Sequence, residues 1–74
     1  MHLITALRVE IQNNLDYIFE LENELNRLNS LLTIISRQSI INYSQRIVSI
    51  KNKISLEKES VNYQQKLLQE LILN

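Results

Sequence analysis

The chain of 74 residues contains no glycine, no proline and no cysteine. Without glycine or proline, no residue breaks a helix cheaply, because the other residues differ by at most about 0.7 kcal/mol in helix propensity. Without cysteine, the disulfide framework of many small secreted domains is excluded. Leucine and isoleucine together supply 24 residues, which is enough to give a helix a buried stripe. The composition therefore predicts an all-α chain that forms a single domain.

Residues that carry chemistry are equally scarce. His2 is the only histidine, so a zinc site built from nitrogen and sulfur ligands is not expected, and neither is a nucleophilic triad. Without glycine there is no phosphate-binding loop. The formal net charge is zero, which argues against the basic field that nucleic-acid binding needs. No apolar run approaches the roughly 18 residues of a membrane span. We therefore expect a soluble, non-enzymatic protein with no catalytic residues, no cofactor and no metal.

Two heptad patterns run along the chain, one in each half. In the first, positions a are 4, 11, 18, 25 and 32 and positions d are 7, 14, 21, 28 and 35, and nine of these ten residues are aliphatic. In the second, positions a are 40, 47, 54, 61 and 68 and positions d are 43, 50, 57, 64 and 71, and eight of ten are apolar. Such repeats predict helices that pack along a coiled-coil seam, the name used below for the a and d positions. The two frames are one residue out of phase, and the slip falls at 36–39.

Two architectures fit this slip. One is a continuous helix of about 110 Å at roughly 1.5 Å per residue. The other is an antiparallel two-helix hairpin, with helices over about 3–35 and 40–72 and a turn at about 36–39, in which Ser39 caps the second helix. A hairpin closing between residues 37 and 38 sets residue i beside residue 75 minus i. Every a position then meets a d position. The same pairing between two chains remains an alternative.

The charges favour the antiparallel pairing. Residues 10–24 hold acidic side chains and no basic ones, and residues 46–53 hold basic side chains and no acidic ones. The pairing rule places Glu24 opposite Lys51 and Glu22 opposite Lys53. We therefore expect the hairpin, dimerising into a four-helix bundle if two copies associate.

The middle of the seam has three mixed layers. They pair Ile18 with Glu57, Asn14 with Val61, and Ile11 with Gln64. A buried, unpaired carboxylate is costly, so the hairpin is expected to splay here or to be covered by a neighbour. Asn14 either specifies the register, as a buried asparagine can, or is solvated where the seam opens; the mixed layers favour the second interpretation.

More apolar residues lie outside the seam than one two-helix interface can bury. A large exposed apolar patch on a small protein usually marks an interface. Self-association and contact with a different protein are both open on the sequence alone. The candidate partner-binding residues are Leu15, Phe19, Leu56, Tyr63, Leu67 and Ile72.

A small, cysteine-free helical hairpin with surplus apolar surface resembles the co-chaperones of bacterial type III secretion needle subunits, the YscE/PscE/EscE-like proteins. The resemblance covers the whole chain in length, in its two helices, in a connection near 36–39 and in Tyr43 just after it. The usage of Ile, Asn and Ser also suits an AT-rich bacterial virulence island. The resemblance implies a cytoplasmic protein that stabilises a helical-repeat chaperone and helps to keep the needle subunit monomeric before export.

Two other function classes stay open beside this resemblance. One is a self-assembling structural coiled coil, a homodimer or tetramer without a client. The other is a small RNA-binding hairpin dimer of the kind that some plasmids encode, for which the basic residues between Arg46 and Lys58 are the only candidate patch.

Overall fold

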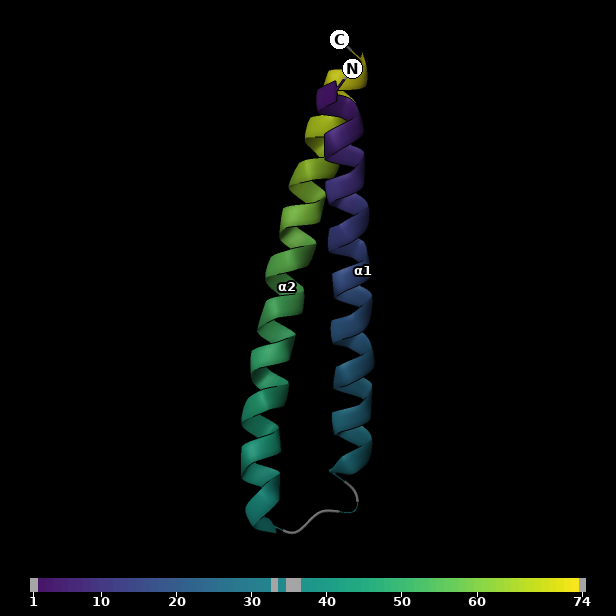
Figure 1. The fold of residues 1–74 in the computed structure, drawn as a ribbon. Helices are drawn as coiled ribbons and strands as arrows, with labels where there is room; N and C mark the ends of the chain where they lie inside the picture. Colours follow the sequence, from purple (N-terminus) through teal and green to yellow (C-terminus); the bar gives the residue numbers. More distant parts are fainter. Residues whose placement is uncertain (1, 33, 35–36, 74) are drawn as a thin grey trace.

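The computed structural model describes residues 2–32, 34 and 37–73, which form a hairpin of two long helices. Helix α1 (His2–Leu31) and helix α2 (Arg37–Leu73) lie side by side and run antiparallel, so both ends of the chain meet at the same end of the molecule (Figure 1). The molecule measures 56 × 14 × 13 Å, and its long axis is the length of α2. The all-α class and the antiparallel hairpin predicted from the sequence are confirmed.

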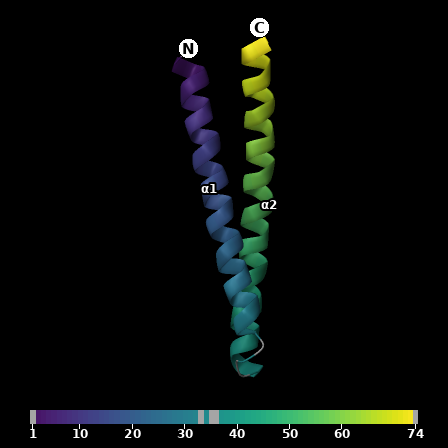
Figure 2. The same cartoon turned by 90° about the vertical axis from the view of Figure 1, so that its right-hand side faces the viewer.

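The helices are inclined to each other. In Figure 1 they overlap near the chain ends and separate toward the connection, whereas the view at right angles in Figure 2 shows the reverse. The two helices therefore wind partly around each other, as expected when a seven-residue apolar repeat keeps two straight 3.6-residue helices in contact. Neither helix combines the length and the apolarity that crossing a bilayer demands.

The connection comes earlier in the chain than expected. Because α2 begins at Arg37, residues 37–39 are helical, and the prediction of a turn over 36–39 is wrong there. Ser39 consequently lies within α2 instead of capping it, and Ser36 lies outside the described residues. Helix α1 ends at Leu31, four residues before the predicted end.

The backbone hydrogen bonds at this end tighten the last turn of α1. The amide of Leu32 donates to the carbonyl of Leu28, and the amide of Ile34 donates to that of Leu31, both at 3.1 Å. The sequence that follows Leu32 is Thr-Ile-Ile, whose β-branched side chains lower helix propensity. Within the described residues no backbone adopts a positive φ, so the absence of glycine imposes no strain there.

The core is the predicted seam. The buried hydrophobic residues all occupy a or d positions and come from both helices in similar number. They are Leu7, Ile11, Ile18, Leu21, Leu28, Ile47, Ile50, Ile54 and Val61. Half-buried seam residues extend this core toward both ends: Leu25, Leu32, Tyr43, Leu68 and Leu71. The layer predicted for Ile35 and Ile40 includes Ile35, which lies outside the described residues.

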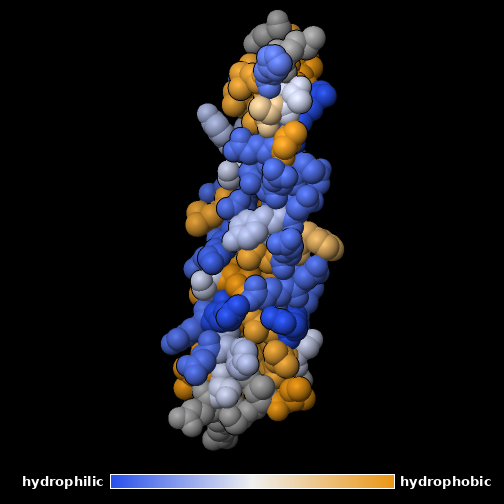
Figure 3. All heavy atoms as spheres, viewed as in Figure 1, coloured by the Kyte–Doolittle hydropathy of each residue, from blue (hydrophilic) through white to orange (hydrophobic). Residues whose placement is uncertain are grey.

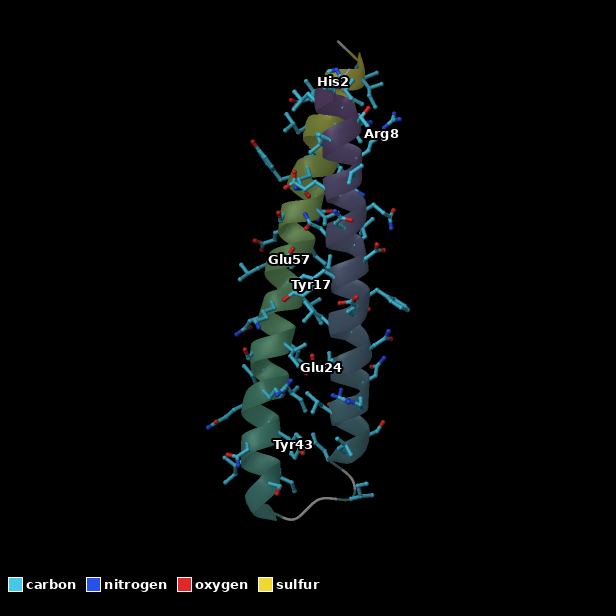
Figure 4. The ribbon with its side chains drawn as sticks, in the orientation of Figure 1. His2, Arg8, Tyr17, Glu24, Tyr43 and Glu57 are labelled. Carbon is cyan, nitrogen blue, oxygen red and sulfur yellow. The ribbon has the colours of Figure 1, made fainter. Side chains whose placement is uncertain are left out.

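The mixed layers are closed, so the prediction of a splayed hairpin is wrong. Ile18 and Val61 are only 5% and 4% exposed. The amide of Asn14 donates a hydrogen bond of 2.9 Å to the side-chain oxygen of Gln64, which is itself buried. Asn14 is thus half-buried and paired, which overturns the interpretation of a solvated asparagine. Glu57 stays half-exposed, so no unpaired carboxylate is buried in this part of the seam. Tyr17 extends from α1 toward α2 near Glu57 (Figure 4).

Among the described residues two ion pairs flank the seam, and neither is a predicted pair. Arg46 pairs with Glu24 on one side, and Lys58 pairs with Glu22 at 3.8 Å on the other. Glu24 and Arg46 both occupy g positions, and Glu22 and Lys58 both occupy e positions. When the second helix of a hairpin reverses direction, g faces g and e faces e, so the predicted e-to-g pairs lie on opposite sides of the seam. Predicting which charged residues pair therefore requires the side of the seam on which each lies as well as its position along the helix.

Candidate protein-binding surfaces

An open groove of about 440 Å³ lies on one flank of the seam, halfway along the hairpin. Helix α1 contributes two exposed apolar side chains to its rim, Leu15 (39% exposed) and Phe19 (66% exposed). Its floor is the buried pair Ile18 and Val61. The remaining lining residues are Glu22, Lys58, Asn62 and Gln65. The groove thus has an apolar floor, a rim that is apolar on α1 apart from Glu22, and a polar rim on α2.

The helical repeat explains why these residues converge. Leu15 and Glu22 are e positions and Phe19 is a b position of the first heptad frame, while Lys58, Asn62 and Gln65 take the e, b and e positions of the second. In an antiparallel pair the b and e flanks of the two helices face the same side. The ion pair between Glu22 and Lys58 joins the two walls at one end. The groove is therefore a direct consequence of the seam register.

Only two of the predicted partner-binding residues line the groove. Leu15 and Phe19 line the groove. Tyr63 (69% exposed), Leu56 (65% exposed) and the half-buried Leu67 do not, because they lie roughly 150–170° around the α2 axis from the groove-facing side at 100° per residue. The predicted set thus divides into two surfaces on opposite flanks of the hairpin.

The last predicted residue belongs to neither cluster. Ile72 is 51% exposed on the e flank of α2 near the chain ends, about 16 Å along the helix from Val61 at 1.5 Å per residue. Its neighbourhood at that end of the molecule includes the exposed Leu3 and Leu73. It therefore marks an apolar tip and does not line the groove.

The face that carries the g positions of α1 is largely hydrophilic. Figure 3 shows a largely polar band across the middle of one face, with apolar side chains projecting at its margins. Figure 4 places Tyr17, Glu24 and Glu57 on this face. The exposed apolar side chains therefore project at the margins of this face and leave its middle polar.

Sequence reasoning missed the floor and the polar wall of the groove. Ile18 and Val61 were interpreted only as seam residues, although both also line the groove. Asn62 and Gln65 carried no signal by residue type. The e and b positions of the two frames contained the information, because they specify which polar residues face Leu15 and Phe19.

The hairpin exposes more surface than a compact protein of its size. Its accessible surface is 5903 Å², whereas a folded monomer of 8.8 kDa is expected to expose about 4,800 Å². The surplus of roughly 1,100 Å² exceeds the ~800 Å² per partner that a standard protein interface covers. The surplus follows from the elongated shape of the hairpin, which measures 56 × 14 × 13 Å.

The described residues offer no group of three or more His, Cys, Asp or Glu side chains that could hold a metal ion. Comparison with protein-family models, curated proteins and solved structures found no match to this chain. The candidate surfaces are therefore argued from their own geometry.

Proposed function

We propose that this chain is a non-enzymatic protein-binding module, and that the groove beside Leu15 and Phe19 receives apolar side chains from a helix of another protein. The observation that carries the proposal is the groove itself, which combines a buried apolar floor with an aromatic residue held 66% exposed at its rim. Exposing the phenylalanine ring to water is unfavourable. A partner that covers the ring gains about 25 cal/mol per Å² of apolar area removed from water.

A helix is the partner that suits the shape of the groove. The groove lies between α1 and α2, and its rim residues Leu15 and Phe19 are spaced four residues apart. A partner helix presents apolar side chains at the same spacing of three and four residues, so its ridge fits between the walls. The charged end formed by Glu22 and Lys58 and the amides of Asn62 and Gln65 provide polar contacts at the edge.

The resemblance to needle-subunit co-chaperones supports a more specific role. In this role the hairpin binds a helical-repeat chaperone in the bacterial cytoplasm, stabilises it, and helps to keep the needle subunit monomeric before export. The physical logic is that an aggregation-prone amphipathic helix stays monomeric while its apolar face is covered. The hairpin is long and thin and exposes apolar side chains along its flanks. This shape suits a subunit that covers a helix of its partner.

The test is calorimetric titration of the hairpin into the helical-repeat protein encoded beside a needle subunit in the same gene neighbourhood. We expect binding that weakens at least ~10-fold in the Phe19→Ala variant, because exposed aromatic anchors dominate such contacts. Val9→Ala is the matched control, since Val9 is 55% exposed on the same helix but does not line the groove.

Two outcomes contradict the proposal in different ways. Binding that is equal in the wild type and in Phe19→Ala would show that the groove is not the contact. Absence of binding to the helical-repeat protein, together with binding to a different helical partner that requires Phe19, would retain the module and reject the co-chaperone role.

A further inference from the structure

A second heptad stripe runs along α2 outside the seam. Its members succeed one another at intervals of three and four residues, so they form one straight row on the helix. They are Lys53, Leu56, Ser60, Tyr63, Leu67 and Glu70. All are exposed except Leu67, which is half-buried, and all occupy c or g positions, on the flank opposite the groove. The groove of the proposed function does not use this stripe.

The stripe is complementary to its own reverse. If α2 of one hairpin lies antiparallel to α2 of another, residue i can face residue 123 minus i. Leu56 then faces Leu67 of the second copy, and Ser60 leaves space for the ring of Tyr63. At both ends Lys53 faces Glu70. Each of these contacts occurs twice, as a two-fold axis requires.

We propose that the chain forms a homodimer through this stripe, with α2 antiparallel to α2 of a second copy. Charge selects the occupant and its direction, because a parallel arrangement sets Lys53 against Lys53 and Glu70 against Glu70. Among the described residues neither side chain has an ion-pair partner within its own hairpin.

The dimer adds a property that one hairpin lacks. Since the stripe and the groove lie on opposite flanks, the dimer leaves both grooves open, and they face away from each other. A dimer therefore binds two partner helices at once. This consequence rests on the proposed function, but the dimer itself does not.

The first experiment measures mass by sedimentation equilibrium and uses a charge reversal. The wild type is expected to reach twice the chain mass of 8.8 kDa as concentration rises. Lys53→Glu sets like charges together twice, so the dimer should dissociate about 10-fold more readily, and adding Glu70→Lys to the same chain should restore it. Lys51→Glu is the matched control, because it makes the same charge change two residues away at an e position.

The second experiment tests direction by cross-linking, which the absence of native cysteine makes simple. The double variant L56C/L67C should form a covalent dimer through two disulfides. The two cysteines cannot join within one chain, because they lie about 16 Å apart on one helix and a disulfide needs α-carbons within ~7 Å. L56C alone should remain uncross-linked.

Each alternative result overturns the proposal. A mass of one chain up to several hundred micromolar excludes the dimer. A dimer that Lys53→Glu and Lys51→Glu weaken equally, or that neither weakens, uses another surface. Efficient cross-linking of L56C alone shows a parallel pairing. Loss of the dimer in Phe19→Ala, with Lys53→Glu unchanged, assigns the second copy to the groove instead.

Discussion

The side chain of Asn14 donates a hydrogen bond of 2.9 Å to that of Gln64 across the seam, between the buried aliphatic residues Ile11, Ile18 and Val61. Both residues occupy d positions, which elsewhere in the seam are mostly aliphatic. An apolar pair of similar size would therefore fit the same space. A polar pair in a core fixes which residues face each other, since any slip leaves a buried amide without a partner.

This relationship gives a first prediction. Asn14→Leu leaves the buried amide of Gln64 without its partner and should lower the free energy of unfolding by about 1–3 kcal/mol. The double variant N14L/Q64L should recover most of that loss, because an apolar pair carries no unsatisfied group. Urea unfolding of the two single variants and the double variant measures the coupling, and additive effects would contradict the hydrogen bond.

The second prediction compares two neighbours on α1. Ile18 is 5% exposed and Phe19 is 66% exposed, although the sequence makes them adjacent apolar residues. Ile18→Ala should cost about 2–5 kcal/mol, enough to unfold much of so small a protein, because it leaves a cavity in the seam. Phe19→Ala should change stability by less than about 0.5 kcal/mol. Thermal melts followed by circular dichroism distinguish them, and comparable losses would place Phe19 in the core.

The third prediction concerns the flank rule. A double-mutant cycle on Glu24 and Arg46, each changed to Gln, should give a coupling of about 0.2–1 kcal/mol that disappears near 1 M salt. The same cycle on Glu24 and Lys51 should give none, because these residues lie on opposite sides of the seam. A larger coupling for Lys51 would show that the helices are rotated relative to the arrangement described.

Much of the fold follows from the sequence because the hydrophobic repeat is strong. Alternation of aliphatic residues at a and d positions predicts which side chains are buried, and Ile47, Ile50 and Ile54 are buried as expected. The exact connection does not follow. The phase slip indicates only that the heptad frame changes between Leu32 and Ile40, and serines at both 36 and 39 offer equivalent caps for a second helix.

The partner surfaces were only partly predictable for a different reason. Exposure outside the seam follows from the repeat, so Leu15, Phe19, Leu56 and Tyr63 were correctly expected on the surface. Their division into two flanks depends on how far each lies around its helix. The hydrogen bond between Asn14 and Gln64 was also missed. The rule that sets residue i beside residue 75 minus i gives each residue one partner, whereas long side chains also reach the neighbouring layer.

The groove as a protein-binding site is tested most directly by methyl and amide chemical shifts of the isotope-labelled hairpin during titration with the helical-repeat chaperone. The account predicts that the largest changes fall on Leu15, Ile18, Phe19 and Val61, and that Leu56 and Tyr63 shift little. Changes confined to Leu56, Tyr63 and Leu67, with the groove residues unmoved, would contradict it.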